Sequence, residues 1–118
     1  MSEFLYIYRG GDSAGSSASP EEMQKTMQKW VAWMKELGEQ GHLKAIGNPL
    51  EPTGKVVKIN GKGKAITDGP YAEAKDLVGG YTIIQAKDLD EAAELSKGCP
   101  HFDSGGFVEV RPIMQINP

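Results

Sequence analysis

The sequence predicts a single α+β domain, because its length fits one domain and its apolar segments alternate between strand-like and helix-like spacing. The chain has 118 residues, within the usual size of one domain with one core. Short apolar runs bounded by glycine and proline predict strands, and two amphipathic segments predict helices. The predicted order is strand, long helix, strands with a hairpin, strand, helix, strand. That order is close to the split βαβ pattern of ferredoxin-like domains.

The first half of the chain is predicted to begin with one strand and a long helix. Residues 4–8 are aromatic or aliphatic and stop at a glycine pair, as a short strand does. Residues 12–19 are rich in glycine and serine and predict a mobile loop. The helix is expected over residues 20–40, because Ser19 can cap it and Glu22 follows three residues later, as in a capping box. Its inner face is expected to carry residues spaced by three and four, namely Met23, Met27, Trp30, Met34 and Leu37.

The rest of the chain predicts a hairpin, further strands and a second helix. The strands are expected at residues 43–46, 56–59, 65–67, 81–86 and 107–114. Asn60-Gly61 is a turn signal between the second and third of these strands, which predicts the hairpin. Acidic residues within 88–91 open the second helix, and residues 98–100 end it. Residues 72–77 have the composition of one helical turn, but the segment is too short to predict a helix.

Two helices cover only one face of such a sheet, so the other face decides how the protein assembles. Side chains alternate along a strand, which sends Leu5 and Ile7 to one face and Tyr6 and Tyr8 to the other. Both sets are apolar or aromatic, which indicates that both faces are buried. The sequence therefore predicts a homodimer, in which a second copy covers the face that the helices leave open.

The last strand indicates which charged residues lie on the open face. Its valines are expected to meet the helices, so that Glu109 and Arg111 lie on the open face beside Tyr6 and Tyr8. An aromatic face with a few charged groups is typical of a dimer cavity or a ligand pocket, so all four are ligand-binding candidates. Arg111 could grip a carboxylate-bearing ligand. Alternatively, Glu109 and Arg111 pair with each other or across the dimer interface.

Composition disfavours several classes of protein. The single cysteine, Cys99, has no partner for an internal disulfide, and paired-cysteine metal motifs are absent, so we expect neither metal nor cofactor. The net charge of −3 and the sparse lysines argue against nucleic-acid binding. The N-terminal segment lacks the features of a signal peptide, and apolar runs stay short of the roughly 18 residues that a membrane span needs. We therefore expect a cytoplasmic protein without membrane association.

One motif resembles the signature of a known family. The stretch Thr67-Asp68-Gly69-Pro70-Tyr71 resembles the signature of the DGPF branch of the YCII-related family, with Tyr71 where the name has Phe. The resemblance covers nearly the whole chain and continues through Gly79-Gly80-Tyr81, Cys99-Pro100 and Val108-Glu109-Val110-Arg111-Pro112. It implies a dimeric α+β barrel in which two sheets pack face to face. It also implies a regulatory association, because some members lie beside genes for extracytoplasmic-function sigma factors or are fused to them.

The resemblance also supplies one candidate catalytic residue, Asp68, and the position of His42 after the first helix supplies a second. Other YCII-related proteins are similar to muconolactone-type enzymes with a His–Asp pair, and this chain matches the Asp at Asp68 but has no His in its first helix. Asp68 is either a general acid or base at a cavity mouth or a turn residue that bonds its own backbone. His42 is the second catalytic candidate if it meets Asp68, and otherwise it interacts with the end of the first helix. Tyr71 and Glu73 in the signature loop are ligand-binding candidates, although Glu73 also suits a solvated surface position.

Three functions remain open from the sequence. The first is a small-molecule-binding or regulatory homodimer. The second is a cofactor-independent enzyme that does acid–base chemistry on a small organic acid or lactone with Asp68, while Arg111 polarises the substrate. The third is an interaction partner of a transcription factor of the sigma type. An enzyme needs Asp68 and a second titratable group in one pocket, whereas a binding module needs only the pocket.

Overall fold

Six strands and two α-helices make up the described part of the chain. The computed structural model describes residues 1–11, 19–69 and 76–116. The elements, in chain order, are β1 (Ser2–Gly10), α1 (Pro20–Glu39), β2 (Leu43–Ala45), β3 (Gly54–Asn60), β4 (Gly63–Gly69), β5 (Val78–Ala86), α2 (Leu89–Ser96), a 3₁₀ helix (Pro100–Ser104) and β6 (Gly106–Pro112). The mobile loop expected at residues 12–19 and the short segment 72–77 lie almost entirely outside the described residues.

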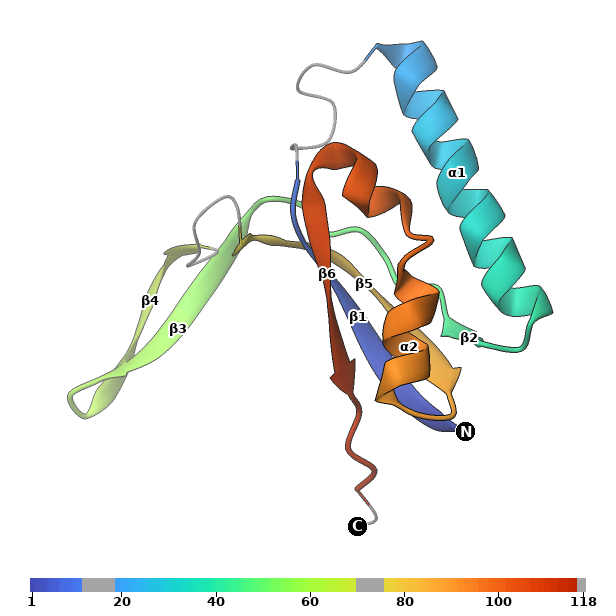
Figure 1. Cartoon of the computed structure of the whole chain (residues 1–118). Helices are drawn as coiled ribbons and strands as arrows, with labels where there is room; N and C mark the ends of the chain where they lie inside the picture. The colour runs from blue at the N-terminus through green and yellow to red at the C-terminus, as the bar shows by residue number, and fades with distance from the viewer. Residues whose placement is uncertain (12–18, 70–75, 117–118) are drawn as a thin grey trace.

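Four of the strands form one antiparallel sheet in the spatial order β2-β5-β1-β6. Without the hairpin β3–β4, the chain runs β1, α1, β2, β5, α2, β6, and this chain order with that strand order is the ferredoxin-like arrangement. Both helices pack on the same face of the sheet, because the side chain of Tyr6 contacts Trp33 of α1 and Ala92 of α2 (Figure 1). The predicted α+β, ferredoxin-like fold with an extra hairpin is therefore confirmed.

Helix α1 begins where the sequence predicts, but it packs on the sheet only through its C-terminal half. The Ser19 hydroxyl accepts a hydrogen bond from the backbone N–H three residues later, at 3.1 Å. The buried residues of the helix are Trp33 and Leu37. The expectation that Met23 and Met27 belong to the core is wrong, because both are exposed. The reason is geometric: the N-terminal half of α1 extends past the end of the sheet (Figure 1).

Tyr6 and Tyr8 lie in the core, so the expectation that they line the open face is wrong. Together with Phe4 they are the buried side chains of β1. The Tyr6 ring stacks on Trp33 with 5.9 Å between the ring centroids, and its hydroxyl donates a hydrogen bond to the Ala92 carbonyl at 2.6 Å. A buried tyrosine needs both apolar surface for its ring and a partner for its hydroxyl, and the side of the sheet that the helices cover offers both.

The last strand follows the predicted alternation. Its two valines lie opposite the two tyrosines of β1 and pack against the same core. The Tyr8 hydroxyl completes this layer by donating a hydrogen bond to the Thr82 hydroxyl at 2.6 Å. Glu109 and Arg111 alternate with the valines, and they therefore lie on the open face of the sheet.

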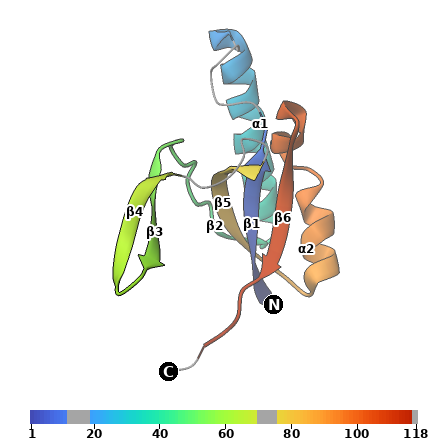
Figure 2. The ribbon, with the colours of Figure 1, turned by 90° about the vertical axis from the view of Figure 1, so that its left-hand side faces the viewer.

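The hairpin β3–β4 stands apart as a separate two-stranded sheet. Its turn lies between Asn60 and Gly63, where the sequence predicts one. The hairpin projects away from the helices in Figure 1 and lies on the side of the sheet opposite α2 in Figure 2. The principal extents are 50 × 46 × 18 Å, and the radius of gyration is 16.4 Å. A compact domain of this length has a radius of gyration of about 13.5 Å, so the chain is flat and open.

Candidate ligand-binding face

The open face of the four-stranded sheet carries a patch of apolar side chains, which we call the open-face patch. Leu5 and Ile7 of β1 lie opposite Ile83 and Tyr81 of β5, and all four are partly buried. Phe107 of β6 lies on the same face, opposite Arg9, and is exposed. Both described helices pack on the other face, so no helix in the described part of the chain covers this patch (Figure 2).

A cluster of three charged side chains borders this patch. The Arg9 Nε donates a hydrogen bond to one carboxylate oxygen of Glu109 at 2.7 Å, and Arg111 Nη1 donates to the other at 3.3 Å. The hydrogen bond from Arg9 is the largest of the effects that hold the pKa of Glu109 below its usual range. Two guanidinium groups thus share one carboxylate, and the cluster keeps a net positive charge. Arg111 is mostly exposed and makes only this one bond to a described residue, so several of its five N–H donors face solvent.

Arg9 also bonds to Asp76, which lies between the signature stretch and β5 in the sequence. The Arg9 Nη1 donates to the Asp76 carbonyl at 2.9 Å. The pairing of β1 with β5 shifts beside it, because Tyr8 lies opposite Gly80 while Arg9 lies opposite Val78. Such a bulge re-aims the neighbouring side chains. Sequence reasoning did not select Arg9, although a signal was present: Arg9 follows Ile7 by two residues and so shares its face.

Asp68 lies on the hairpin and not on the four-stranded sheet. It is in β4, directly opposite Lys55 of β3, and the two side chains form an ion pair. The Asp68 side chain is 90% exposed. An ion pair this exposed contributes at most about 1 kcal/mol. The carboxylate is therefore available to a partner or ligand, but in the described chain its neighbour is a lysine and not a second acid or base.

His42 lies at the opposite end of β5 from the signature segment. Its Nδ1 is 2.8 Å from the Gln85 carbonyl oxygen, and its backbone N–H donates to the Leu37 carbonyl at the end of α1. The signature segment instead leads into the start of β5 at Val78. The nine residues of β5 span about 26 Å. The structure does not bring His42 and Asp68 together within one chain. His42 instead bonds through its backbone N–H to the last turn of α1.

The remaining candidates of the signature loop, Tyr71 and Glu73, lie outside the described residues. Their assignment as ligand-binding residues stays a prediction. The described end of the loop at Asp76 is held by Arg9, which ties the loop to the charged cluster on the open face.

The second histidine and the cysteine have structural partners. The His101 Nε2 lies 2.8 Å from the Arg9 carbonyl oxygen, and its ring packs beside that of Tyr8 with 5.8 Å between centroids. Burial raises the pKa of the Cys99 thiol to about 12. Among the described residues, no three His, Cys, Asp or Glu side chains gather as a metal site would require. None of the described helices has the length and apolarity needed to cross a membrane.

Fold and open face together define a class of small ferredoxin-like α+β domains that leave one sheet face uncovered. The chain belongs to the YCII-related domain family, whose model matches residues 1–117. A curated relative is an uncharacterized protein of Rhizobium meliloti (strain 1021), 29% identical over 109 residues that cover 91% of this chain and 88% of the relative. A similar solved structure is 5-chloro-2-hydroxyhydroquinone dehydrochlorinase from Burkholderia phenoliruptrix AC1100 in complex with 2,5-dihydroxybenzoquinone. It has a TM-score of 0.40 and 21% identity, and the match covers 90% of each chain.

Proposed function

We propose that this YCII-related protein is a small-molecule-binding homodimer whose ligand lies between the open sheet faces of two copies. The observation that carries the proposal is the uncovered open-face patch with the cluster of Arg9, Glu109 and Arg111 at its border. An apolar surface with a few convergent polar groups is what small-molecule sites are made of.

The dimer follows from the cost of leaving this patch in water. Each Å² of apolar surface removed from water stabilises by roughly 25 cal/mol, and the four paired side chains of β1 and β5 lie next to one another in the patch. Two sheets that pack face to face lie about 10 Å apart, which allows side chains from both to interdigitate. A twofold axis through the patch would cover both copies with the same set of residues.

The charged cluster determines the chemistry of the ligand. Arg111 presents unused N–H donors at the border of an apolar surface, a combination that suits a carboxylate attached to an apolar body. Glu109 holds both arginines in place, so their orientation is set before a ligand arrives. We therefore infer that the ligand is an anionic small molecule with an aromatic or aliphatic body.

The experiment compares ligand binding by wild-type protein and two charge-removing variants. Benzoate and hexanoate serve as apolar carboxylates, and benzyl alcohol serves as the uncharged control. We expect calorimetry to detect both acids but not the alcohol, and Arg111→Gln to bind the acids at least about tenfold more weakly, as expected for a charge-assisted hydrogen bond. Lys97→Gln, which removes a positive charge from the end of α2, is the matched control and should bind like the wild type.

Three outcomes decide between this function and its alternatives. A monomer mass for the wild type in light scattering would overturn the proposal. Equal affinity of Arg111→Gln and wild type would also overturn it, because Arg111 would then not hold the ligand. Loss of binding or turnover in Asp68→Asn, with Arg111→Gln unaffected, would favour the enzyme that uses Asp68 instead. In the binding module, Asp68→Asn retains the wild-type affinity.

A further inference from the structure

One face of the hairpin carries three exposed apolar side chains, next to Lys64 and the Lys55–Asp68 ion pair, and nothing in the described chain covers them. Residues directly opposite in an antiparallel pair share a face, so Val57 and Ile66 lie on one face of the hairpin, and Ile59 follows two residues later on the same face. These side chains are 57%, 67% and 80% exposed, respectively. A two-stranded hairpin is at best marginally stable by itself in water. Three exposed β-branched residues on such a hairpin indicate that this face packs against another surface.

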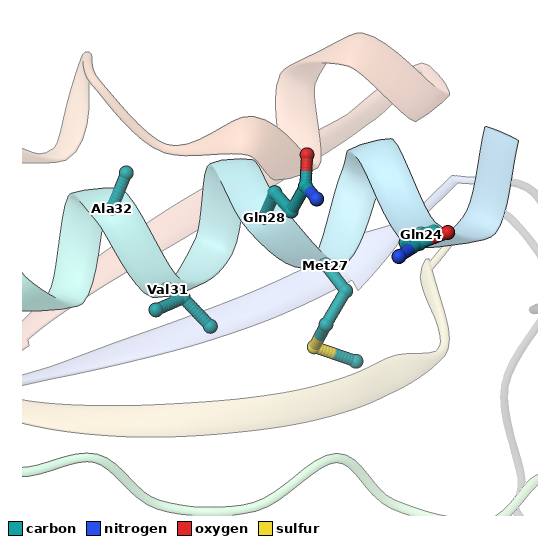
Figure 3. Close-up of a pocket in the computed structure, with 5 residues that line it drawn as sticks. All are labelled: Gln24, Met27, Gln28, Val31 and Ala32. Carbon is teal, nitrogen blue, oxygen red and sulfur yellow. The ribbon is translucent and has the colours of Figure 1, made fainter. Parts of the chain in front are cut away.

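A second uncovered apolar surface lies on the N-terminal half of α1. Met23, Met27 and Val31 follow one another at intervals of four residues, which places them on one side of the helix. They are 50%, 63% and 60% exposed. A shallow hollow of about 410 Å³ is lined by Gln24, Met27, Gln28, Val31 and Ala32 of this helix, and Met27 and Val31 point the same way within it (Figure 3).

These two surfaces cannot meet within one chain. The hairpin and α1 lie at opposite ends of the molecule, with the four-stranded sheet between them (Figure 1). We infer that in the homodimer the hairpin of one copy packs its Val57, Ile59 and Ile66 face against Met23, Met27 and Val31 on α1 of the second copy. This inference rests on the proposed dimer. It gives each of the two remaining exposed apolar surfaces a partner on the second copy.

The charge distribution favours a second copy as the occupant. Residues 54–69 carry four lysines and one aspartate, a net charge of +3, while the whole chain carries −3. The remaining residues therefore carry −6. A basic hairpin on an acidic body is attracted to the body of another copy. Glu21 and Glu22, in the first turn of α1, lie next to Met23 and supply negative charge at one end of the stripe.

The reach of the hairpin also fits this arrangement. Its strands have seven residues each and span about 20 Å. The hairpin lies on the open side of its own sheet, where the second copy packs (Figure 2). Two stacked layers, each about 10 Å thick, separate the facing sheets and the helices behind the far sheet. A hairpin of this length extends from its own sheet to the helix layer of the second copy.

Cysteine cross-linking tests the contact directly. The native Cys99 is buried, so new surface cysteines react selectively. The double variant Ile66→Cys with Met27→Cys should give a covalent dimer with a short bismaleimide. Ile66→Cys with Leu89→Cys is the matched control, because Leu89 is an exposed apolar residue on α2, and it should stay uncrosslinked. A covalent dimer from Ile66→Cys alone would overturn the inference, since it would show that the two hairpins pack on each other.

A charge pair provides the second test. We expect Met27→Glu and Ile66→Lys each to raise the dimer dissociation constant about tenfold, and the combined variant to recover most of that loss, because each new glutamate would meet a new lysine of the other copy. Light scattering over a dilution series gives these constants. If the wild type is dimeric and neither single variant weakens it, the hairpin contact is wrong while the proposed function stands. If the wild type is monomeric, both fail.

Discussion

Two buried tyrosine hydroxyls show how single residues orient this sheet. Tyr6 and Tyr8 have raised pKa values because burial disfavours their charged forms. Each hydroxyl nevertheless has a partner, the Ala92 carbonyl for Tyr6 and the Thr82 hydroxyl for Tyr8. The rings provide apolar area. The Tyr6 hydroxyl ties the sheet to α2, and the Tyr8 hydroxyl ties β1 to the neighbouring strand β5. These residues therefore stabilise the core.

Replacing Tyr6 with Phe tests this structural role. The variant removes the hydroxyl that bonds Ala92 and leaves a small gap, so we expect the free energy of unfolding to fall by about 1 kcal/mol. Urea unfolding followed by far-UV circular dichroism measures the change. Tyr81→Phe is the control, because the Tyr81 hydroxyl makes no hydrogen bond to a described residue, and its stability should stay near that of the wild type. An unchanged stability of Tyr6→Phe would contradict the assignment.

Glu109 makes stability depend on pH in a predictable direction. Hydrogen bonding to Arg9 lowers the pKa of this carboxyl from an ordinary value of 4.5. Its pKa is therefore lower in the folded than in the unfolded protein, so it stabilises the fold above pH 4.5, and this contribution is lost as the pH falls through the folded pKa. We expect Glu109→Gln to be less stable than wild type at neutral pH and to approach it in acid.

Denaturant titrations at several pH values measure this difference. A difference between Glu109→Gln and wild type that stays constant from neutral to acid pH would contradict the prediction. Glu94→Gln, which removes a carboxylate from an exposed pair with Lys97 on α2, controls for the general effect of losing one negative charge.

Residue patterns predicted the alternation in β1 but not its direction. The sequence alternates two apolar sets, so it predicts that both faces of the strand are buried without indicating which face the helices cover. What decides the direction is the hydroxyl partner that each tyrosine finds on the helix side, and that partner comes from residues more than seventy positions away. Arg9 was missed for a related reason, because its importance depends on Glu109 in the last strand.

At the scale of elements, one glycine fixes the connection that follows β2. Gly47 has a φ of +75°, and a Cβ at this position would collide with the backbone carbonyl of Tyr81. The chain thus approaches β5 so closely that no side chain fits. Gly41 has a similar φ of +80°, but its Cβ would meet nothing within 4 Å.

This pair of glycines gives a matched comparison. We expect Gly41→Ala to lower the free energy of unfolding by about 1–2 kcal/mol, because a residue with a Cβ is strained in the left-handed backbone conformation. Gly47→Ala carries the same backbone cost, and in addition it must move the connection away from β5, so we expect a loss of about 3 kcal/mol or more. Thermal or urea unfolding of the two variants compares these costs. Equal losses of stability in the two variants would contradict the prediction, because they would mean that the backbone at residue 47 moves away from β5 at no cost.

Elements were predicted well where local signals determine them. The cap at Ser19, the turn after Asn60 and the acidic start of α2 all lie where the sequence places them. The inner face of α1 was predicted only in part, because periodicity shows which residues share a side but not how far the sheet extends beneath them. Trp33 and Leu37 lie above the sheet, whereas Met23 and Met27 lie beyond its end.

At the scale of the whole molecule, the part of the chain that the structure describes leaves three groups of apolar side chains uncovered. They are the open-face patch, the outer face of the hairpin and the N-terminal stripe of α1. Alternation within a strand leads to the prediction of a second copy on the open face, and that dimer stays a prediction. The sequence could not predict the other two surfaces, because they result from where the hairpin and α1 project relative to the sheet.

The order of the strands in space has a consequence for how the chain folds as it is synthesised. The hairpin is a local structure that forms in about 1–10 μs once its residues are available. The central strand β1, by contrast, pairs with β6 near the end of the chain. Tyr6 therefore cannot pair with Val110 until Val110 has been synthesised. At about 5–20 residues per second, synthesis takes roughly 5–20 s to cover that separation. Both edges of β1 are unpaired until β5 has been made, and one edge stays unpaired until β6 has been made. This is the interval in which wrong pairing with other chains competes with folding.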